Sequence, residues 1–222
     1  MSDPGSPTAP SDDVRVRRAA ARAAYDAEAV HAIVDAAIVA HVGTVRDGTP
    51  VVIPMFAVRD GDDLLLHGAP AAGALRRGEG VEVCATMTLL DGLVLARSPF
   101  HHSVNYRSVV ILGTAELVDD PAEKERALEL FVERLIPGRQ EHLRQSTEKE
   151  IRGTSVLRVS LAKSSAKVRT GDPIDDDEDY ELPIWAGVVP VTTQFGAPQD
   201  DARNLEGVEV PEHVQAIAGR VL

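Results

Sequence analysis

This sequence contains very little cysteine, since Cys84 is the single one among 222 residues. One cysteine excludes an internal disulfide framework and a zinc site built from several thiolates. Cys84 lies in the apolar run VEVCATMTLL, where a thiol is expected to pack as a small buried hydrophobic side chain. Stability must therefore come from a hydrophobic core, and a chain of this length is long enough to form one.

Long apolar runs and an excess of positive charge are also missing. No segment reaches the ~18 apolar residues that a membrane span requires, and the N-terminus does not have the pattern of a secretion signal. A cytoplasmic protein without membrane contact is therefore expected. The chain has 23 Lys and Arg against 35 Asp and Glu, a formal net charge of −12. Such acidity argues against nucleic acid as a partner, although a few local arginines can still bind one phosphate.

Several catalytic and metal-binding motifs are absent. The sequence shows no Ser-His-Asp order, no glycine-rich nucleotide loop and no HExxH helix. The segment DPIDDDEDYE, residues 172–181, lacks the glycine and the distal glutamate of a calcium loop, so it is expected to be a solvated acidic loop. His101 and His102 are adjacent, and adjacent strand residues point to opposite faces. No metal site is therefore expected.

Hydrophobic periodicity predicts a mainly β protein with helices, an α+β fold. Residues 1–12 are expected to form a mobile tail, residues 13–198 one domain and residues 199–222 a C-terminal extension. The predicted strands cover about residues 38–45, 49–58, 63–68, 81–96, 107–118 and 155–170, and the predicted helices about residues 27–37, 71–77, 121–136 and 147–151. Asp47-Gly48 predicts a hairpin turn, and Pro54 predicts a strand edge or a bulge. Because the first connections are too short for parallel crossovers, an antiparallel barrel is expected.

The main candidate for a binding site lies between two apolar strands, in LDGLVLARSPFHHSVNYRSVVILG (90–113). A polar loop is predicted from His101 to Arg107, with Ser108 next to it. Tyr106 offers a ring for stacking, Arg107 a guanidinium for phosphate and Ser108 a hydroxyl. The alternative is a strand start whose arginine is merely solvated.

Two further groups of residues are weaker candidates. His67-Gly68-Ala69 ends a strand and leads into a predicted short helix with Arg76 and Arg77, whose free N–H groups suit an anion. Lys163, Lys167 and Arg169 have spacings that place them on one face of a single late strand. That face either completes an anionic pocket or is an ordinary solvated surface.

The order of several motifs resembles a known family. They are GTPVVIP, LHGA, DGLVLARSPFHHSVNYRSVVILG, PGR, SAKVRTGDPIDDDEDY and WAGVVPV. Over about residues 14–198 the chain resembles the pyridoxamine 5′-phosphate oxidase-like, FMN-binding split-barrel superfamily, in its nitroimidazole-resistance-related, flavin-nucleotide-binding branch. The resemblance implies a six-stranded antiparallel split β-barrel that forms a homodimer, with FMN at the subunit interface. Relatives carry a Lys or Arg in a Gly-x-Lys-like turn after the HGA motif, and here the nearest cations are Arg76 and Arg77.

The resemblance also implies roles for particular residues. Val51, Val52, Ile53 and Pro54 would run along the isoalloxazine edge. His67 would lie near the reactive face of the ring as the catalytic residue, and Gly68 and Ala69 would approach the phosphate. Tyr106, Arg107 and Ser108 would hold the ribityl phosphate, with Arg76 as a further cation. Lys167, Arg169 and Trp185 would close the pocket, with the partner subunit as one source of these groups.

The implied function is that of an FMN-dependent oxidoreductase, which transfers hydride or electrons between the flavin and a small organic substrate. Oxidation of vitamin B6 is not implied, because the substrate-recognition residues of the oxidase are not evident. Two alternatives stay open. One is a deazaflavin-dependent reductase. The other is a non-catalytic protein that binds or senses flavin or haem, with His67, His101 and His102 as conceivable axial ligands.

Overall fold

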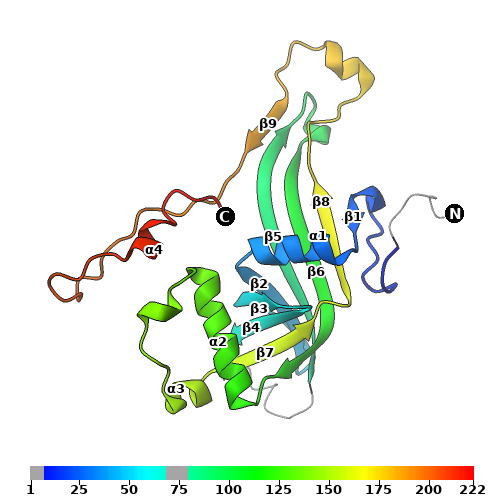
Figure 1. Ribbon diagram of the computed structural model, residues 1–222. Coiled ribbons are helices and arrows are strands. Elements are labelled where there is room, and N and C mark those ends of the chain that lie inside the picture. Colours follow the sequence, from blue (N-terminus) through cyan, green and yellow to red (C-terminus); the bar gives the residue numbers. More distant parts are fainter. Residues whose placement is uncertain (1–7, 69–79) are drawn as a thin grey trace.

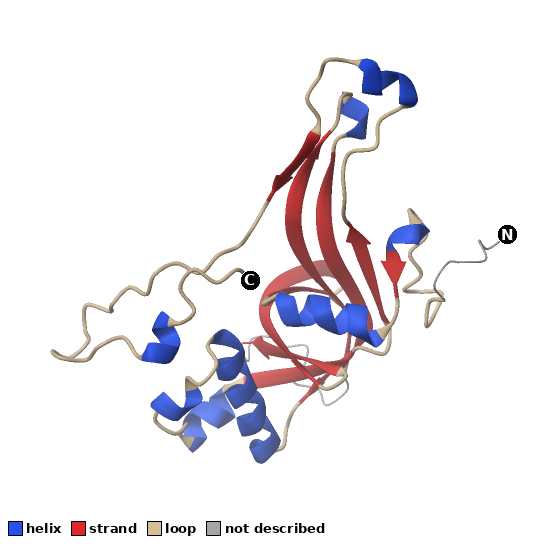
Figure 2. Cartoon of the chain, turned by 45° about the horizontal axis from the view of Figure 1, so that its top comes forward, coloured by secondary structure: helices blue, strands red, loops and turns tan. Residues whose placement is uncertain are grey.

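The computed structural model describes residues 8–68 and 80–222, and the strands in these residues form one antiparallel sheet. The strands are β1 (Ala23–Ala24), β2 (Val39–Arg46), β3 (Thr49–Asp60), β4 (Asp63–Gly68), β5 (Val81–Leu95), β6 (Ser103–Leu117), β7 (Ser155–Ser160), β8 (Ser164–Arg169) and β9 (Gly187–Pro190). Six of them close into a ring in the order β2, β3, β4, β7, β6, β5, because β5 pairs back onto β2. This ring, visible in Figure 2, confirms the expected split barrel.

The hairpin of β5 and β6 extends well beyond the ring (Figure 1). Both strands have 15 residues, and each carries a different strand on its outer edge. β8 pairs with β6, and β9 pairs with β5 near the tip. The short β1 then pairs with β8. The resulting order across the extended part is β1, β8, β6, β5, β9, and this order decides which candidate residues are neighbours.

The helices are α1 (Ala27–Ala36), α2 (Pro121–Leu135), α3 (Glu148–Gly153) and α4 (Glu212–Gln215), with short 3₁₀ segments η1 (Ala20–Arg22), η3 (Pro99–His101), η4 (Gln140–His142) and η5 (Asp177–Glu181). Asp26 caps α1 by accepting a hydrogen bond from the Ala29 N–H at 2.8 Å, and Asp120 caps α2 through the Glu123 N–H at 2.8 Å. Both helices thus begin where the sequence predicts them. No helix in the described residues is long and apolar enough to cross a bilayer.

Two hydrophobic clusters hold the helices onto the barrel. α1 contributes Val30, Ile33 and Val34 to the larger cluster, together with residues of the ring strands. The smaller cluster lies under α2 and includes Phe131. β4 serves both clusters, because Leu64 and Leu66 belong to the first and Leu65 to the second. This explains why three consecutive leucines are fully buried on one strand.

The first hairpin forms as predicted. Asp47 and Gly48 have φ values of 49° and 78°, the left-handed backbone that a two-residue turn of this kind requires. The Pro54 expectation is confirmed as well, since residues 49–55 of β3 pair with β2 and not with β4. One edge of this half of the strand is therefore unpaired within the described chain, and a proline costs no ladder hydrogen bond there.

The prediction of one strand over residues 155–170 is wrong. The segment forms β7 and β8, joined by a turn at residues 161–163. The Ser164 hydroxyl donates to the Leu161 carbonyl at 2.7 Å and stabilises the turn. The segment contains no Gly, Pro, Asn or Asp to mark such a turn, so the periodicity of the sequence predicts one uninterrupted strand. Lys163 consequently lies in the turn and does not share a strand face with Lys167 and Arg169.

The C-terminal residues form an arm at the side of the barrel (Figure 1). The arm folds back on itself, since the Phe195 N–H donates to the Arg220 carbonyl at 3.0 Å and the Gly219 N–H donates to the Phe195 carbonyl at 2.9 Å. α4 lies within this arm.

Candidate functional site

The predicted polar loop is shorter than the sequence suggests. β6 begins at Ser103, so Tyr106, Arg107 and Ser108 lie inside a strand and not at a loop tip. Their backbone pairs with β5 on one side and with β8 on the other. Polar residues are tolerated at these central positions because the side chains are only half-buried.

Arg107 has a carboxylate partner that the sequence analysis missed. Its Nε and terminal Nη2 donate to Asp91, with N···O distances of 3.0 Å and 2.7 Å for the two shortest contacts. Asp91 lies at the irregularity of β5 between Leu90 and Gly92. The hydrogen bonds from Arg107 to Asp91 raise the pKa of the guanidinium despite its partial burial. The Arg107 charge is therefore already compensated within the chain.

Four of the predicted residues are brought together by the pairing of β6 with β8. Tyr106 lies opposite Arg169, and Ser108 lies opposite Lys167. Directly opposite residues in an antiparallel pair lie side by side. The Ser108 hydroxyl donates to the Lys167 carbonyl at 3.3 Å, and the Lys167 ammonium donates to the Arg18 carbonyl at 3.0 Å. The N-terminal segment thus covers this edge of the sheet.

Arg169 is buried without a carboxylate partner in the described chain, and only 6% of its surface is exposed. Its guanidinium donates to the Asn105 side-chain oxygen and to the carbonyls of Gly171 and Asp172, all of which are neutral acceptors. Its Nε has no partner among the described groups. Burial, together with the nearby charge of Arg22, lowers the pKa of Arg169. A buried cation of this kind is costly unless an anion compensates it.

A second group of predicted residues lies on β3 and β4. Val52 and Ile53 are 64% and 40% exposed, on the half of β3 with an unpaired edge. His67 is the last residue but one of β4. Its exposed ring stands edge-on to Phe131 at a centroid distance of 5.5 Å, and it makes no hydrogen bond to a described residue. Gly68 follows it. Ala69, Arg76 and the predicted helix at 71–77 lie outside the described residues.

Trp185 lies apart from both groups within one chain. It precedes β9, which pairs with β5, whereas Lys167 and Arg169 lie on β8, which pairs with β6. Two strands therefore separate these edges, a distance on the order of 14 Å at the usual strand spacing. The Trp185 side chain is 67% exposed. A single chain does not bring Trp185 to the cations that it was predicted to join.

The expectation of a fully solvated acidic loop is wrong for one residue. The Asp175 side chain is completely buried against the hairpin tip, where it accepts the Arg97 backbone N–H at 3.0 Å and an Arg97 Nη at 2.9 Å. Arg97 also stacks on the Tyr180 ring, 4.8 Å from its centroid. Burial acts to raise the pKa of Asp175, but the Arg97 hydrogen bonds outweigh it and lower this pKa. The segment is thus anchored to the hairpin.

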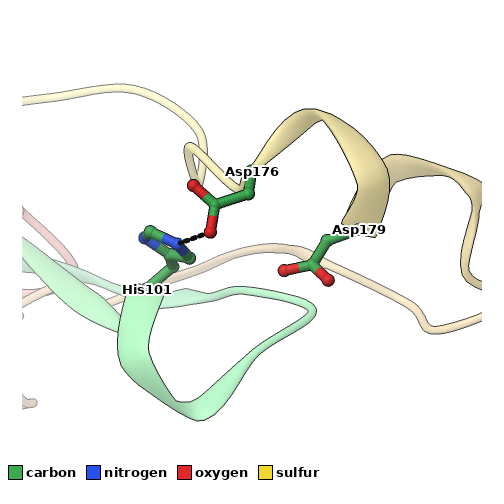
Figure 3. Close-up of side chains that lie close together, drawn as sticks. All are labelled: His101, Asp176 and Asp179. Carbon is green, nitrogen blue, oxygen red and sulfur yellow. Dashed lines mark hydrogen bonds and ion pairs between the residues drawn. The ribbon is translucent and has the colours of Figure 1, made fainter.

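His101 meets two carboxylates of this anchored segment (Figure 3). Ligand atoms of His101, Asp176 and Asp179 lie within 4.8 Å of one another, and His101 Nε2 is 3.3 Å from Asp176. The pairing of His101 with Asp176 accounts for this arrangement. His102 has a different partner, because its Nδ1 is 2.8 Å from the Ser98 carbonyl. The residue is exposed, and its Nε2 has no partner among the described groups.

The sequence analysis missed Asp91, Asn105 as a partner of Arg169, and the N-terminal arginines. Arg18 and Arg22 belong to the run VRVRRAAARAA, which is strongly basic in an acidic chain. That local charge contrast is the one signal by which they could have been found.

A closed ring of six antiparallel strands with an extended hairpin defines a split-barrel protein. The family model described as pyridoxamine 5′-phosphate oxidase matches residues 26–168, which is more than half of the chain. The chain therefore belongs to the pyridoxamine 5′-phosphate oxidase-like family, as its motifs predicted. No curated protein sequence matches it.

Solved structures give more specific likenesses. The chain is 46% identical to flavocytochrome Anf3 from Azotobacter vinelandii, with a TM-score of 0.90, over 96% of this chain and all of the other. It is 37% identical to an FAD and haem binding protein from Mycobacterium smegmatis, with a TM-score of 0.84, over 89% of this chain and 98% of the other. A candidate 5-nitroimidazole antibiotic resistance protein from Bacteroides thetaiotaomicron is 25% identical, with a TM-score of 0.54, over 66% of this chain and 86% of the other.

Proposed function

We propose that this protein is an electron-transfer flavoprotein of the flavocytochrome type, which binds FAD and haem. The observation that carries the proposal is the 46% identity to flavocytochrome Anf3 over nearly the whole of both chains. The FAD and haem binding protein from Mycobacterium smegmatis, 37% identical, supports the same pair of cofactors. The sequence resemblance implied FMN, and the FAD and haem binding protein favours the dinucleotide.

The described residues fit such cofactors. The buried Arg169 lacks a counter-ion, and both FAD and haem carry anionic groups. Exposed apolar side chains at Val52, Ile53 and Trp185 suit the faces of planar rings. When bound, the flavin and the haem would supply the electron-transfer chemistry. The protein would supply the binding, the orientation and the local charge.

Two histidines keep a ring nitrogen available for such a cofactor. The His67 ring makes no hydrogen bond to a described residue. His102 directs Nδ1 toward the Ser98 carbonyl at 2.8 Å, and a fixed Nδ1 with a free Nε2 is the usual arrangement of a metal-ligating histidine. The His101 ring, by contrast, contacts Asp176 through its Nε2. His67 and His102 are therefore our two candidates for a residue that would hold haem iron.

We also propose that the protein acts as a homodimer. Exposed apolar residues follow the extended hairpin and its neighbours: Leu90, Leu93, Val104, Ile184, Trp185 and Val189. A patch of this kind indicates an interaction surface. A two-fold axis could bring Trp185 of one subunit to the cations of the other. We expect a dimer at micromolar concentration in light scattering, and a shift toward monomer in Leu93→Asp, whereas an equally charged change at the exposed Val45 should have no effect.

The test of the cofactor proposal is direct. The full-length protein is purified, its absorption spectrum is recorded, and the ligands released by denaturation are identified by chromatography and mass. Flavin bands together with a Soret band, and release of FAD, would support the proposal. Release of FMN would support the sequence-based prediction, and a deazaflavin would support the reductase alternative. The proposal fails if neither flavin nor haem is released and the protein binds neither when they are added.

A second candidate function is catalysis on a small organic substrate, with His67 as a proton donor near the flavin. The exposed, unbonded imidazole at the end of β4 favours it, because a general acid must be able to reach the substrate. Reoxidation of the photoreduced protein by menadione would separate the two functions. A slower reaction in His67→Asn with unchanged cofactor content would indicate a proton-donor role, and loss of the Soret band would indicate an iron ligand.

A further inference from the structure

The C-terminal arm, residues 192–222, makes its hydrogen bonds within itself (Figure 1). One example is the bond from the Phe195 N–H to the Arg220 carbonyl at 3.0 Å. Within residues 8–68 and 80–222, no hydrogen bond or ion pair joins the arm to the barrel or to the other helices. Apart from its covalent connection to β9, the arm is therefore held on the barrel by packing.

This packing is loose at one place and close at another. A cavity of about 320 Å³ lies between the end of the arm, at Phe195, Ile217 and Leu222, and the ends of α1 and α2. By contrast, the His213 ring of α4 stacks on the His142 ring of η4, with centroids 4.3 Å apart and an interplanar angle of 19°. Among the described residues, this stack is the one aromatic contact between the arm and the rest of the chain.

The His213 ring is poorly placed to carry a positive charge. Its Nε2 is buried and has no hydrogen-bond partner among the described groups. Burial lowers the pKa of His213 from its usual 6.5, and the neighbouring His142 and Arg139 act in the same direction. The carboxylates of Glu133 and Glu141 act in the opposite direction but do not outweigh them. While it is stacked on His142, the His213 imidazole is therefore neutral at pH 7.

Protonation of His213 opposes the stack in two ways. A protonated Nε2 is a donor without an acceptor in its buried position, which is costly, and the new charge faces Arg139. In a released arm the ring is hydrated and takes up a proton near the usual pKa of 6.5. Docking of the arm is therefore strongest above pH 6.5 and weakens as the pH falls below it. Glu133 does not cause this change, because backbone hydrogen bonds from Gly138 and Gln140 lower its pKa and keep it ionised.

We propose that His142 and His213 form a pH-dependent latch, which holds the C-terminal arm on the barrel at neutral pH and releases it as His213 takes up a proton. α4 has four residues, too few to be stable as a helix without packing, so release of the arm also unfolds α4. The latch does not depend on the identity of the cofactor, because neither histidine belongs to the proposed cofactor site.

Amide hydrogen exchange of the full-length protein, followed by mass spectrometry, tests the latch. Protection factors for residues 211–217 are measured between about pH 7.5 and about pH 5, so that the intrinsic pH dependence of exchange is divided out. His213→Phe keeps an aromatic ring for the stack but takes up no proton. His41→Asn is the matched control, because it removes an exposed histidine of β2, outside both the arm and η4.

We expect the protection of residues 211–217 in the wild type to fall by more than about threefold between pH 7 and pH 5, since the limit for one proton is about tenfold for each pH unit. His213→Phe should keep its protection over this range, and His41→Asn should behave as the wild type does. The latch is refuted if the wild type keeps its protection at pH 5, or if His213→Phe loses protection in parallel with the wild type.

An NMR titration of the histidine ring protons in the wild type decides the case in which His213→Phe does not dock at either pH. The latch then requires that His213 titrates below pH 6.5 and that its protonation accompanies the loss of protection in α4. A midpoint for His213 at or above pH 6.5 overturns the proposal, because the docked arm would not disfavour the proton.

Discussion

Arg107 offers the sharpest test, because the sequence and the structure give it different roles. The sequence resemblance makes it a phosphate ligand, whereas the structure pairs it with Asp91. We expect Arg107→Ala to lower the free energy of unfolding by about 1–2 kcal/mol, the usual range for a charged hydrogen bond that is partly solvated. Asp91→Ala should cost a similar amount, since it breaks the same contacts.

The magnitude follows from the geometry of the pair. Nε and Nη2 of Arg107 reach both Asp91 oxygens, with the shortest contact at 2.7 Å. Solvent screens the pair, because the side chains are 36% and 30% exposed. Fully exposed pairs contribute about 0.2–1 kcal/mol. We therefore expect a coupling free energy of about 1 kcal/mol in a double-mutant cycle.

Urea denaturation of the wild type, the two single variants and the double variant measures this coupling. Titrations of the same four proteins with FAD and riboflavin measure whether Arg107 binds the phosphate. Because Arg107 is paired with Asp91, Arg107→Ala should change FAD affinity by less than about threefold. A phosphate ligand would instead lose about 1.5–3 kcal/mol for FAD and nothing for riboflavin. Our reasoning is refuted if Arg107→Ala unfolds like the wild type and yet loses FAD selectively.

Three further predictions concern other sites. The hydrogen bond from Arg126 lowers the pKa of Asp60 below its usual 3.8. The pair therefore stabilises the folded state fully above pH 3.8, and this stabilisation is lost as pH falls through the lowered pKa. Asp60→Asn should lower Tm at pH 7 and have a smaller effect near pH 2.5, and an equal effect at both pH values would contradict this. Asp175→Ala removes the buried partner of Arg97, so limited proteolysis should cut residues 172–181 faster than in the wild type; unchanged cleavage would show that the anchor is not needed. His67→Asn should keep Tm within about 2 °C, since the ring is exposed and surface changes are usually small; a large loss in calorimetry would make His67 structural.

Much of the fold follows from local sequence. Three features depend on residues only a few positions apart and can therefore be predicted from the sequence. They are the Asp47-Gly48 turn, the caps at Asp26 and Asp120, and the alternation of the long strands. The split of 155–170 into β7 and β8 cannot be predicted in this way, because its turn has no residue that marks one. Long-range pairing decides it, since β7 pairs with β4 inside the ring whereas β8 pairs with the extended part of β6.

The candidate site shows the same division. By itself, the sequence determined which residue types are concentrated in HHSVNYRS and KVRTG, and therefore the family. The tertiary structure decided which of these charges are already compensated. Arg107 meets Asp91 across 16 positions, Arg97 meets Asp175 across 78, and Arg169 meets the neutral Asn105 across 64. Electrostatic compensation depends on distance in space, so only the folded chain separates an arginine with a partner from one that still needs an anion.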